Sequence, residues 1–233
     1  MILAIVQARC SSTRLPGKVM APVLGRAMIL RQLERLDRSL MIDRLVVATS
    51  TDASDDSLVE LLQAEGVTVR RGSLDDVAGR FQSVVREFAP TTVVRLTADC
   101  PLADPVVIDH VIREHLKARA DYTSNTLQRT YPQGLDVECV STEAFDLLMI
   151  GPLEDSEREH VTIGIYNHPE VFSLHSVTQQ QDVSNLRWTV DRPDDLAFVR
   201  TVYESLYSDN PEFDQQDILN FLQLNPSVSH TNR

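Results

Sequence analysis

The sequence predicts an α/β fold of three layers, in which helices cover both faces of a mostly parallel β-sheet. Two observations lead to this prediction. Short apolar, β-branched runs alternate with longer segments whose apolar residues recur at helical spacing. The chain of 233 residues is also long enough to bury one substantial core. We therefore expect one domain over residues 1–233, with a smaller α+β lobe at about 121–185.

Each expected element follows from a local pattern of this kind. In the first half, strands are expected at 2–6, 45–48, 67–69 and 91–96, and helices at 30–40, 58–64, 75–88 and 105–117. The second half is more mixed, with strands expected at 122–125, 137–140, 171–177 and 187–190, and helices at 154–166, 193–206 and 214–224. Asp75 or Ser73 is expected to cap the third helix, and Asp104-Pro105 to open the fourth.

Composition and charge exclude several classes of function. The 34 Asp and Glu residues outnumber the 22 Lys and Arg residues, and the net charge of −12 leaves no broad basic surface for nucleic acid or an anionic membrane. No apolar run approaches the ~20 residues of a membrane helix. Three cysteines without C-x-x-C spacing argue against a disulfide framework or a zinc site. We expect a cytoplasmic protein without a nucleic-acid or membrane partner.

Positive charge is concentrated at the start of this acidic chain. In the first 35 residues six cations stand against one acid: Arg9, Arg14, Lys18, Arg26, Arg31 and Arg35 against Glu34. We interpret the segment as a small anion-binding site, because a transit peptide would begin with an amphipathic helix rather than a strand. Arg9, Arg14 and Lys18 are expected to contact the anion, whereas Arg26 and Arg31 are expected on the following helix, where they pair with a surface acid or face solvent, with Arg31 exposed.

The loop after the first expected strand has the composition of a phosphate-binding site. Residues 7–18 contain three cations, three hydroxyls and a glycine that permits close backbone approach. The loop is not a Walker A motif, because Ser12 stands where the first glycine is needed and Val19 where Ser or Thr is needed. A solvated basic loop is the alternative interpretation. It is less favoured because Lys18 is one of only two lysines in the sequence.

Two distant aspartates are candidate ligands for Mg²⁺. Asp99 and Asp191 each follow an expected β-branched strand and precede a proline, so both can face one crevice. Mg²⁺ commonly takes one or two protein carboxylates and completes its shell with phosphate and water oxygens. An aspartate after a strand is often only a helix cap, which is the role expected of Asp194 and Asp195. Cys100 is not favoured as a nucleophile, since no base is expected near it.

The run Gln-Ala-Arg-x-Ser-Ser-Thr-Arg-Leu-Pro-Gly-Lys at 7–18 resembles the opening of the sugar-acid cytidylyltransferases. These include the 3-deoxy-manno-octulosonate and acylneuraminate enzymes, and the spore-coat-polysaccharide cytidylyltransferase-like branch is the most similar. Segments 95–102 and 189–196 resemble the family's two metal-aspartate motifs, and the resemblance covers nearly the full length. It departs at Cys10, where larger side chains are common. The resemblance implies a three-layer, Rossmann-like nucleotidyltransferase fold of the nucleotide-diphospho-sugar transferase type.

The resemblance also assigns roles to residues of the nucleotide site. It implies Lys18, Arg14, Asp99 and Asp191 as catalytic residues, the two aspartates being the ligands of a Mg²⁺ cofactor. It implies nucleotide contacts by Gln7, Ala8, Arg9, Ser11, Ser12, Arg14, Lys18, Ala48, Thr49, Ser50 and Thr97. For residues 48–50, a β-turn with an aspartate cap is an equally good interpretation.

Motifs in the second half resemble the acceptor side of the spore-coat branch. They imply acceptor contacts by Tyr131, Gly134, Asp136, Glu138, Arg158 and His160, any of which is alternatively structural. The family commonly forms homodimers, so a homodimer is expected. We expect Mg²⁺-dependent transfer of CMP from CTP to a small acidic acceptor, a sugar acid by resemblance. A phosphonate or sugar-phosphate acceptor, or a non-catalytic nucleotide-binding regulator, remains the alternative.

Overall fold

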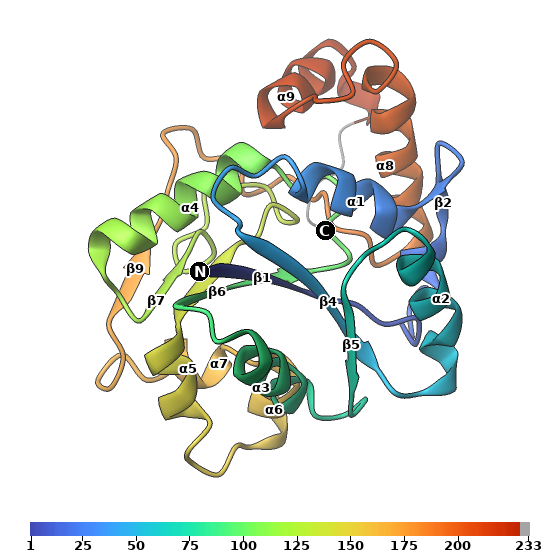
Figure 1. The fold of residues 1–233 in the computed structure, drawn as a ribbon. Helices are drawn as coiled ribbons and strands as arrows, with labels where there is room; N and C mark the ends of the chain where they lie inside the picture. Colours follow the sequence, from blue (N-terminus) through green and yellow to red (C-terminus); the bar gives the residue numbers. More distant parts are fainter. Residues whose placement is uncertain (229–233) are drawn as a thin grey trace.

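The computed structural model describes residues 1–228, which form a seven-stranded β-sheet between two layers of helices (Figure 1). The strands are β1 (Ile2–Gln7), β4 (Arg44–Ser50), β5 (Val69–Gly72), β6 (Thr92–Thr97), β7 (Tyr122–Ser124), β8 (Glu138–Ser141) and β9 (Leu174–Ser176). Their order is β5–β4–β1–β6–β8–β7–β9, and among these seven strands of the described chain β8 alone runs antiparallel to its neighbours. The predicted mostly parallel α/β sheet is confirmed.

Helices cover both faces of this sheet. One face carries α1 (Met28–Leu36), α2 (Asp56–Ala64), α4 (Pro105–Ala118), α8 (Pro193–Leu206) and α9 (Gln215–Leu224). The other carries α3 (Val77–Phe88), α5 (Thr142–Leu148), α6 (Asp155–His160) and α7 (Ile163–Tyr166) (Figure 1). Shorter elements complete the fold: the hairpin β2 (Pro22–Val23) and β3 (Arg26–Ala27), and the 3₁₀ turns η1 (Lys18–Met20), η2 (Ala53–Asp55) and η3 (Pro226–Val228).

Strand β1 shows why an unbroken apolar run forms the centre of the sheet. Ala4 and Val6 pack into the core beneath α1 and α4, whereas Leu3 and Ile5 pack into the core beneath α3 and α5. Successive side chains of a strand point to opposite faces, so a strand covered on both sides must be apolar at every position. All four side chains are fully buried. Among the helices of the described chain, none has the length and apolar character that crossing a bilayer requires.

Helix starts follow the expected capping chemistry, with one correction. The Asp104 carboxylate accepts hydrogen bonds from the Val106 and Val107 backbone N–H groups, and Pro105 occupies the first turn of α4. For α3 the cap is Asp76, which accepts from the Gly79 N–H at 2.9 Å, so the expectation of Asp75 or Ser73 was wrong.

Several expected elements differ from those found. Residues 187–190 form no regular strand, because their backbone groups bond to two loops: Trp188 N–H donates to Gln133 O and Val190 N–H to Asp99 O. The helix expected at 154–166 is broken into α6 and α7 at Val161, whose φ is +49°. The strand expected at 171–177 is confined to Leu174–Ser176, and that at 67–69 is displaced to Val69–Gly72. Residues 28–36, not 30–40, form the first helix.

The second half of the chain extends the same sheet. Strand β8 pairs with β6, which places Glu138 beside Arg95, and β7 and β9 continue outward from β8. The segment expected as a lobe at about 121–185 is therefore hydrogen-bonded to the parallel half, and its role as a separate unit stays a prediction. Because β8 is antiparallel, its first residue lies near the carboxyl ends of the parallel strands.

Candidate active site

Two cavities lie at the edge of the sheet where the parallel strands end. The first cavity has a volume of about 310 Å³. It is lined by Gln7, Arg9, Ser12, Thr13, Arg14, Lys18, Val19, Arg95, Thr97, Ala98, Asp99, Glu159, His160 and Asp191. Ligands of open α/β sheets bind at this edge. The structure thus places six of the predicted nucleotide contacts around one space with both predicted metal ligands, Asp99 and Asp191; the six are Gln7, Arg9, Ser12, Arg14, Lys18 and Thr97.

The loop after β1 folds back so that its last residue enters the first cavity. The Gly17 N–H donates to the Cys10 carbonyl at 2.9 Å and closes the loop. Gly17 has a φ of +70°, in the left-handed region that favours glycine, and it turns the chain directly into η1. Lys18 is the first residue of η1, so this turn fixes where its side chain begins.

Lys18 bridges the two predicted catalytic aspartates, Asp99 and Asp191. Its Nζ lies 3.3 Å from Asp99 Oδ2 and 3.0 Å from Asp191 Oδ1, and it donates to the Val190 carbonyl at 2.7 Å. All three ammonium donors are therefore used. The Arg14 Nη2 lies 2.8 Å from the same Asp191 oxygen, so two cations share one carboxylate.

Backbone hydrogen bonds bring the aspartates together across the chain. The Asp99 carbonyl accepts from the Val190 N–H at 2.7 Å and from the Thr189 hydroxyl at 3.2 Å. The segment after β6 is thereby joined to the segment before α8. These hydrogen bonds bring the Asp99 and Asp191 carboxylates to the same side of the first cavity, although the two residues are far apart in sequence.

Asp191 is held in its charged form by its neighbours. Burial by itself raises its pKa, but hydrogen bonding and charge from Lys18, Arg187 and Arg14 together hold the pKa below its ordinary value. Arg187 Nη2 lies 2.7 Å from Asp191 Oδ2, a contact that sequence reasoning missed. Asp195 accepts from the backbone N–H groups of Asp191 and Arg192, which agrees with its expected capping role.

The donor atoms of this cluster fit Mg²⁺. Two carboxylates that contact one lysine nitrogen can also approach one small cation, and carboxylate oxygens are the ligands that Mg²⁺ prefers. In residues 1–228 no group of three or more His, Cys, Asp or Glu side chains is arranged to hold a metal ion. An ion at Asp99 and Asp191 would therefore take its remaining ligands from a bound substrate and water.

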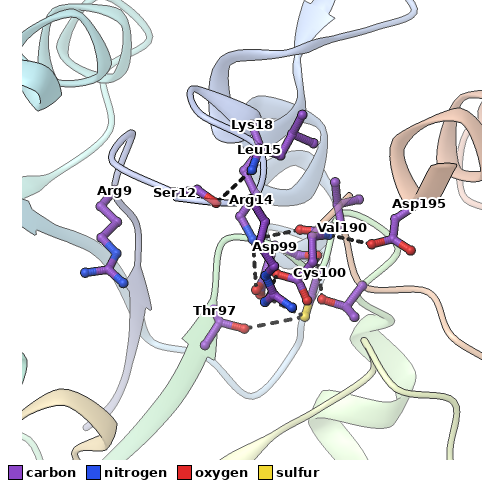
Figure 2. A network of polar contacts seen from close by, with 12 residues as sticks. Arg9, Ser12, Arg14, Leu15, Lys18, Thr97, Asp99, Cys100, Val190 and Asp195 are labelled. Carbon is purple, nitrogen blue, oxygen red and sulfur yellow. Dashed lines mark hydrogen bonds and ion pairs between the residues drawn. The ribbon is translucent and has the colours of Figure 1, made fainter. Parts of the chain in front are cut away.

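Arg9 stands apart from the other two loop cations. Its Nη2 lies 3.6 Å from Glu159 Oε1, and both side chains are about half exposed. Figure 2 shows Arg9 on its own, apart from the group formed by Lys18, Arg14 and Asp99, and all four side chains line the first cavity. Arg9 and Lys18 therefore approach an occupant of the cavity from different directions.

Residues 48–50 are organised by Asp55, which sequence reasoning did not assign to the site. The Thr49 and Ser50 hydroxyls both donate to the Asp55 carboxylate, which also accepts from the Cys10 N–H at 2.7 Å. Thr49, Ser50 and Asp55 are fully buried, and the Ala48 carbonyl accepts from the Ala8 N–H. The predicted nucleotide contacts Ala8, Ala48, Thr49 and Ser50 thus lie behind the cavity wall in this state. Ser11 Oγ is also buried and has no hydrogen-bond partner.

Arg26 and Arg31 do not occupy the positions expected of them. Arg26 lies in β3 and pairs with Glu65 at 2.7 Å. Arg31 is on α1 but buried: it donates to the Val23 and Leu24 carbonyls, and its guanidinium lies over the Tyr207 ring. The expectation that Arg31 faces the surface was wrong, because the β2–β3 hairpin folds over it.

The second cavity adjoins the first and contains part of the predicted acceptor site. It has a volume of about 380 Å³. It is lined by Arg95, Tyr122, Thr126, Leu127, Arg129, Asp136, Glu138, His160 and Tyr166. The structure therefore brings together Asp136, Glu138 and His160, and adds two arginines and two tyrosines that sequence reasoning missed. Arg95 and His160 line both cavities.

Three other predicted acceptor residues lie outside this lining. Tyr131 is buried. Gly134 allows its loop to pack against residues 188–189, where a Cβ would approach the Thr189 nitrogen to 2.6 Å. Arg158 lies 3.4 Å from Asp76, the N-cap of α3.

Polar side chains in the second cavity are already paired. Glu138 accepts from Arg95, from the Thr162 hydroxyl and from the Tyr122 hydroxyl, the last at 2.9 Å. Arg129 binds both oxygens of Asp136, at 2.5 and 2.9 Å. Alternating carboxylates and guanidinium groups beside two aromatic rings suit a ligand that carries both donors and acceptors on an apolar frame.

Cys100, near the first cavity, is unsuited to act as a nucleophile. Its thiol is buried beside Asp99, and burial followed by the neighbouring carboxylates raises its pKa well above the ordinary value. The thiol therefore stays protonated at neutral pH, in line with the expectation from sequence.

Fold and charge together define the class of protein. Nucleotidyltransferases of this type place a triphosphate at the carboxyl edge of a parallel sheet, where cations and carboxylates converge. The chain belongs to the cytidylyltransferase family, whose model matches residues 3–213. It is accordingly an enzyme of the nucleotidyltransferase class, as the resemblance of its motifs implied.

Two relatives support this assignment, one over nearly the full length and one over about half of the chain. The spore coat polysaccharide biosynthesis protein SpsF of Bacillus subtilis (strain 168) is 32% identical over 235 residues, covering 98% of this chain and 96% of the relative. The 3-deoxy-manno-octulosonate cytidylyltransferase of Geobacter sulfurreducens is 34% identical over 113 residues, covering 48% and 44%.

Solved structures share the fold. A cytidylyltransferase from Leptospira borgpetersenii serovar Hardjo-bovis has a TM-score of 0.93 at 29% identity, covering 100% of this chain and 98% of the other. The CMP:2-keto-3-deoxy-manno-octonic acid synthetase, solved in complex with CTP, has a TM-score of 0.66 at 16% identity, covering 87% and 98%. The predicted nucleotidyltransferase fold is confirmed.

Proposed function

We propose that this enzyme transfers CMP from CTP to a small acidic acceptor, with a sugar acid as the first choice, and releases pyrophosphate. One observation carries the proposal: Lys18 joins Asp99 and Asp191 in a cation-rich cavity that adjoins a second, polar cavity. The acceptor oxygen forms a bond to the α-phosphorus, the bond from that phosphorus to the β-phosphate oxygen breaks, and the acceptor proton is released.

The first cavity is assigned to CTP. Lys18, Arg14 and Arg9 reach it from two sides and can neutralise the phosphates, while Ser12 and the loop backbone supply hydrogen bonds. Lys18 and Arg14 are bound to Asp191 in this state, so phosphate oxygens would exchange with that carboxylate. A fold relative solved with CTP supports the assignment.

Asp99 and Asp191 are the residues that would hold Mg²⁺. Bound there with the nucleotide, the ion would neutralise charge on the phosphates and the departing pyrophosphate. The protein orients these two carboxylates. Arg187 and the turn that Asp195 caps hold the Asp191 carboxylate in place. The hydrogen bond from the Val190 N–H to the Asp99 carbonyl fixes the distance between the two aspartates.

The second cavity is assigned to the acceptor. Carboxylates of this cavity that are paired with arginines can instead bind hydroxyl groups of the acceptor, and the arginines can bind its acid group. Tyr122 and Tyr166 provide apolar faces. His160 lines both cavities and is exposed, so it can accept the proton of an attacking hydroxyl where the two meet. The names of the similar proteins, which refer to polysaccharide biosynthesis and to a sugar acid, support a sugar-acid acceptor.

Nucleotide choice is the first test. We expect CTP to raise the melting temperature well above the effect of UTP, ATP or GTP, since a ligand at 100 times its Kd stabilises a protein by about 2.7 kcal/mol. Pyrophosphate release should then require CTP together with an acid from a panel that includes 3-deoxy-manno-octulosonate. Stabilisation by ATP but not by CTP would overturn the proposal.

Metal dependence is the second test. Asp99→Asn and Asp191→Asn should each lower kcat by about 100-fold or more, because a preorganised charge is lost at the reacting phosphates. Binding of Mn²⁺ in the presence of CTP, followed by electron paramagnetic resonance, should weaken in both variants. Asp194→Asn is the matched control, because this exposed carboxylate lies three residues after Asp191, in the first turn of α8, and lines neither cavity. Full turnover in excess chelator would contradict the assignment.

A further inference from the structure

Arg95 lies at the boundary between the two cavities. It is the fourth residue of β6, paired with Ile5 of β1 on one side and with Glu138 of β8 on the other. Its side chain lines both cavities and is only 12% exposed. Within the described site it shares this position with His160 alone, and unlike His160 it projects from the rigid centre of the sheet.

The two ends of the Arg95 guanidinium are differently occupied. Nη1 donates to Glu138 in a close ion pair. Nη2 donates to the Gln7 side-chain oxygen at 3.2 Å, which is long for a hydrogen bond of this kind. Nε is buried and has no hydrogen-bond partner among residues 1–228. One edge of the guanidinium, formed by Nε and Nη2, therefore carries a single weak bond to a neutral group.

That edge has the shape of an oxyanion site. The Nε and Nη2 donors of arginine are parallel and match two oxygens of a carboxylate or a phosphate. A buried donor without a partner carries a free-energy cost that an incoming acceptor removes. Arg129, the other arginine of the second cavity, offers no such edge, because Asp136 already binds it through both oxygens.

The position of the edge identifies the oxyanion. Transfer joins the occupant of the first cavity to the occupant of the second, so the phosphorus that changes partners must lie where the cavities meet. Gln7, whose oxygen the Arg95 edge holds, belongs to the lining of the first cavity. An oxyanion that replaces the Gln7 oxygen therefore comes from the nucleotide.

We propose that the Nε–Nη2 edge of Arg95 binds the nonbridging oxygens of the α-phosphate, and so makes Arg95 a catalytic residue. The inference rests on the proposed function. The nonbridging oxygens stay on the phosphorus while its bond to the acceptor oxygen forms and its bond to pyrophosphate breaks. Arg95 can hold them throughout, while Glu138 anchors its other end.

The test compares two ligands that share no phosphate position. CMP carries only the α-phosphate, whereas pyrophosphate represents the β- and γ-phosphates. Isothermal titration with each ligand, at saturating Mg²⁺, should show CMP affinity about tenfold or more lower in Arg95→Lys and in Arg95→Met. Pyrophosphate affinity should stay within about twofold. Arg95→Lys keeps a positive charge beside Glu138, so it still tests the proposal if the methionine variant does not fold. Arg70→Lys is the control, since Arg70 also projects from a strand and pairs with a glutamate, but outside both cavities.

Each outcome decides the assignment. Selective loss of CMP affinity in the Arg95 variants, with Arg70→Lys unchanged, supports it. Unchanged CMP affinity, or an equal loss for both ligands, overturns it. If the wild-type enzyme binds neither CTP nor CMP, the proposed function itself has failed, and the two failures are thus distinguishable.

Discussion

Lys18 occupies the place between the two aspartates that a divalent cation would take. Its ammonium group bonds Asp99, Asp191 and the Val190 carbonyl, so the repulsion between two neighbouring carboxylates is relieved without a bound ion. A nucleotide with its cation would replace these bonds rather than fill an uncompensated site. Under the proposed function, binding would therefore exchange the ionic partners of Lys18.

The two lysines of the sequence provide a matched comparison. Lys18→Ala should weaken CTP binding and lower kcat/KM by about 100-fold or more, because its charge faces the phosphates. Lys117→Ala should leave both within about twofold, since Lys117 is 76% exposed and pairs only with Glu114 on the same helix. Titration calorimetry and steady-state pyrophosphate release measure the two effects. Equal effects of the two substitutions would show that the loop around Lys18 does not bind phosphate.

Sequence reasoning identified the residues of the site that lie in one short segment. Arg9, Arg14 and Lys18 were recognisable because a strand, hydroxyls and a glycine surround them within the same loop. Arg95 was not, because its partners Glu138 and Gln7 are distant in the sequence. Arg187 and Arg31 have partners within eight residues, but those contacts depend on the turn before α8 and on the β2–β3 hairpin, neither of which is apparent from local periodicity.

At the scale of elements, Asp55 joins the phosphate-binding loop to the end of β4. Its carboxylate accepts from the Cys10 N–H of the loop and from Thr49 and Ser50 of the strand. Burial by itself raises the Asp55 pKa, but the hydrogen bonds from Cys10, Ser50 and Thr49 together hold the pKa below its ordinary value. One buried charge thus positions two segments of the nucleotide site.

Replacing this charge should affect both stability and binding. Asp55→Asn should lower the free energy of unfolding by about 2 kcal/mol, because charged hydrogen bonds to buried groups are lost. It should also weaken CTP binding by about tenfold, since the loop is no longer held in place. Urea denaturation and titration calorimetry are the measurements. Asp52→Asn, at the exposed cap of η2, is the control and should change neither appreciably.

The pH dependence gives a second check on Asp55. Because the folded pKa is depressed, its stabilisation is fully present above the unfolded pKa of about 3.9 and is lost as the pH falls through the folded value. The stabilities of wild type and Asp55→Asn should therefore converge in acid. A constant difference across that range would mean that the charge is not responsible.

For the whole molecule, the alternation of apolar runs and helical patterns was sufficient to predict a mostly parallel sheet covered on both faces. The order of the strands could not be predicted in this way, because it depends on pairings such as β1 with β6, between residues distant in sequence. Segment 187–190 has the β-branched composition of a strand, yet loops rather than strands satisfy its backbone. The homodimer and the cytoplasmic location stay predictions, the first of which light scattering would check.

The antiparallel strand β8 marks the boundary between two halves of one sheet, and the two halves contribute to different cavities. The parallel strands β1, β4, β5 and β6 end around the phosphate-binding loop, whereas β8 and the loop before it supply Glu138 and Asp136 to the second cavity. Substitutions at Thr126, Leu127 and Arg129, which line the second cavity and not the first, can reshape the proposed acceptor side while the first cavity keeps its geometry. Such an arrangement favours evolutionary diversification: a lineage can acquire a new acceptor by remodelling one loop, while the side chains that line the first cavity are retained.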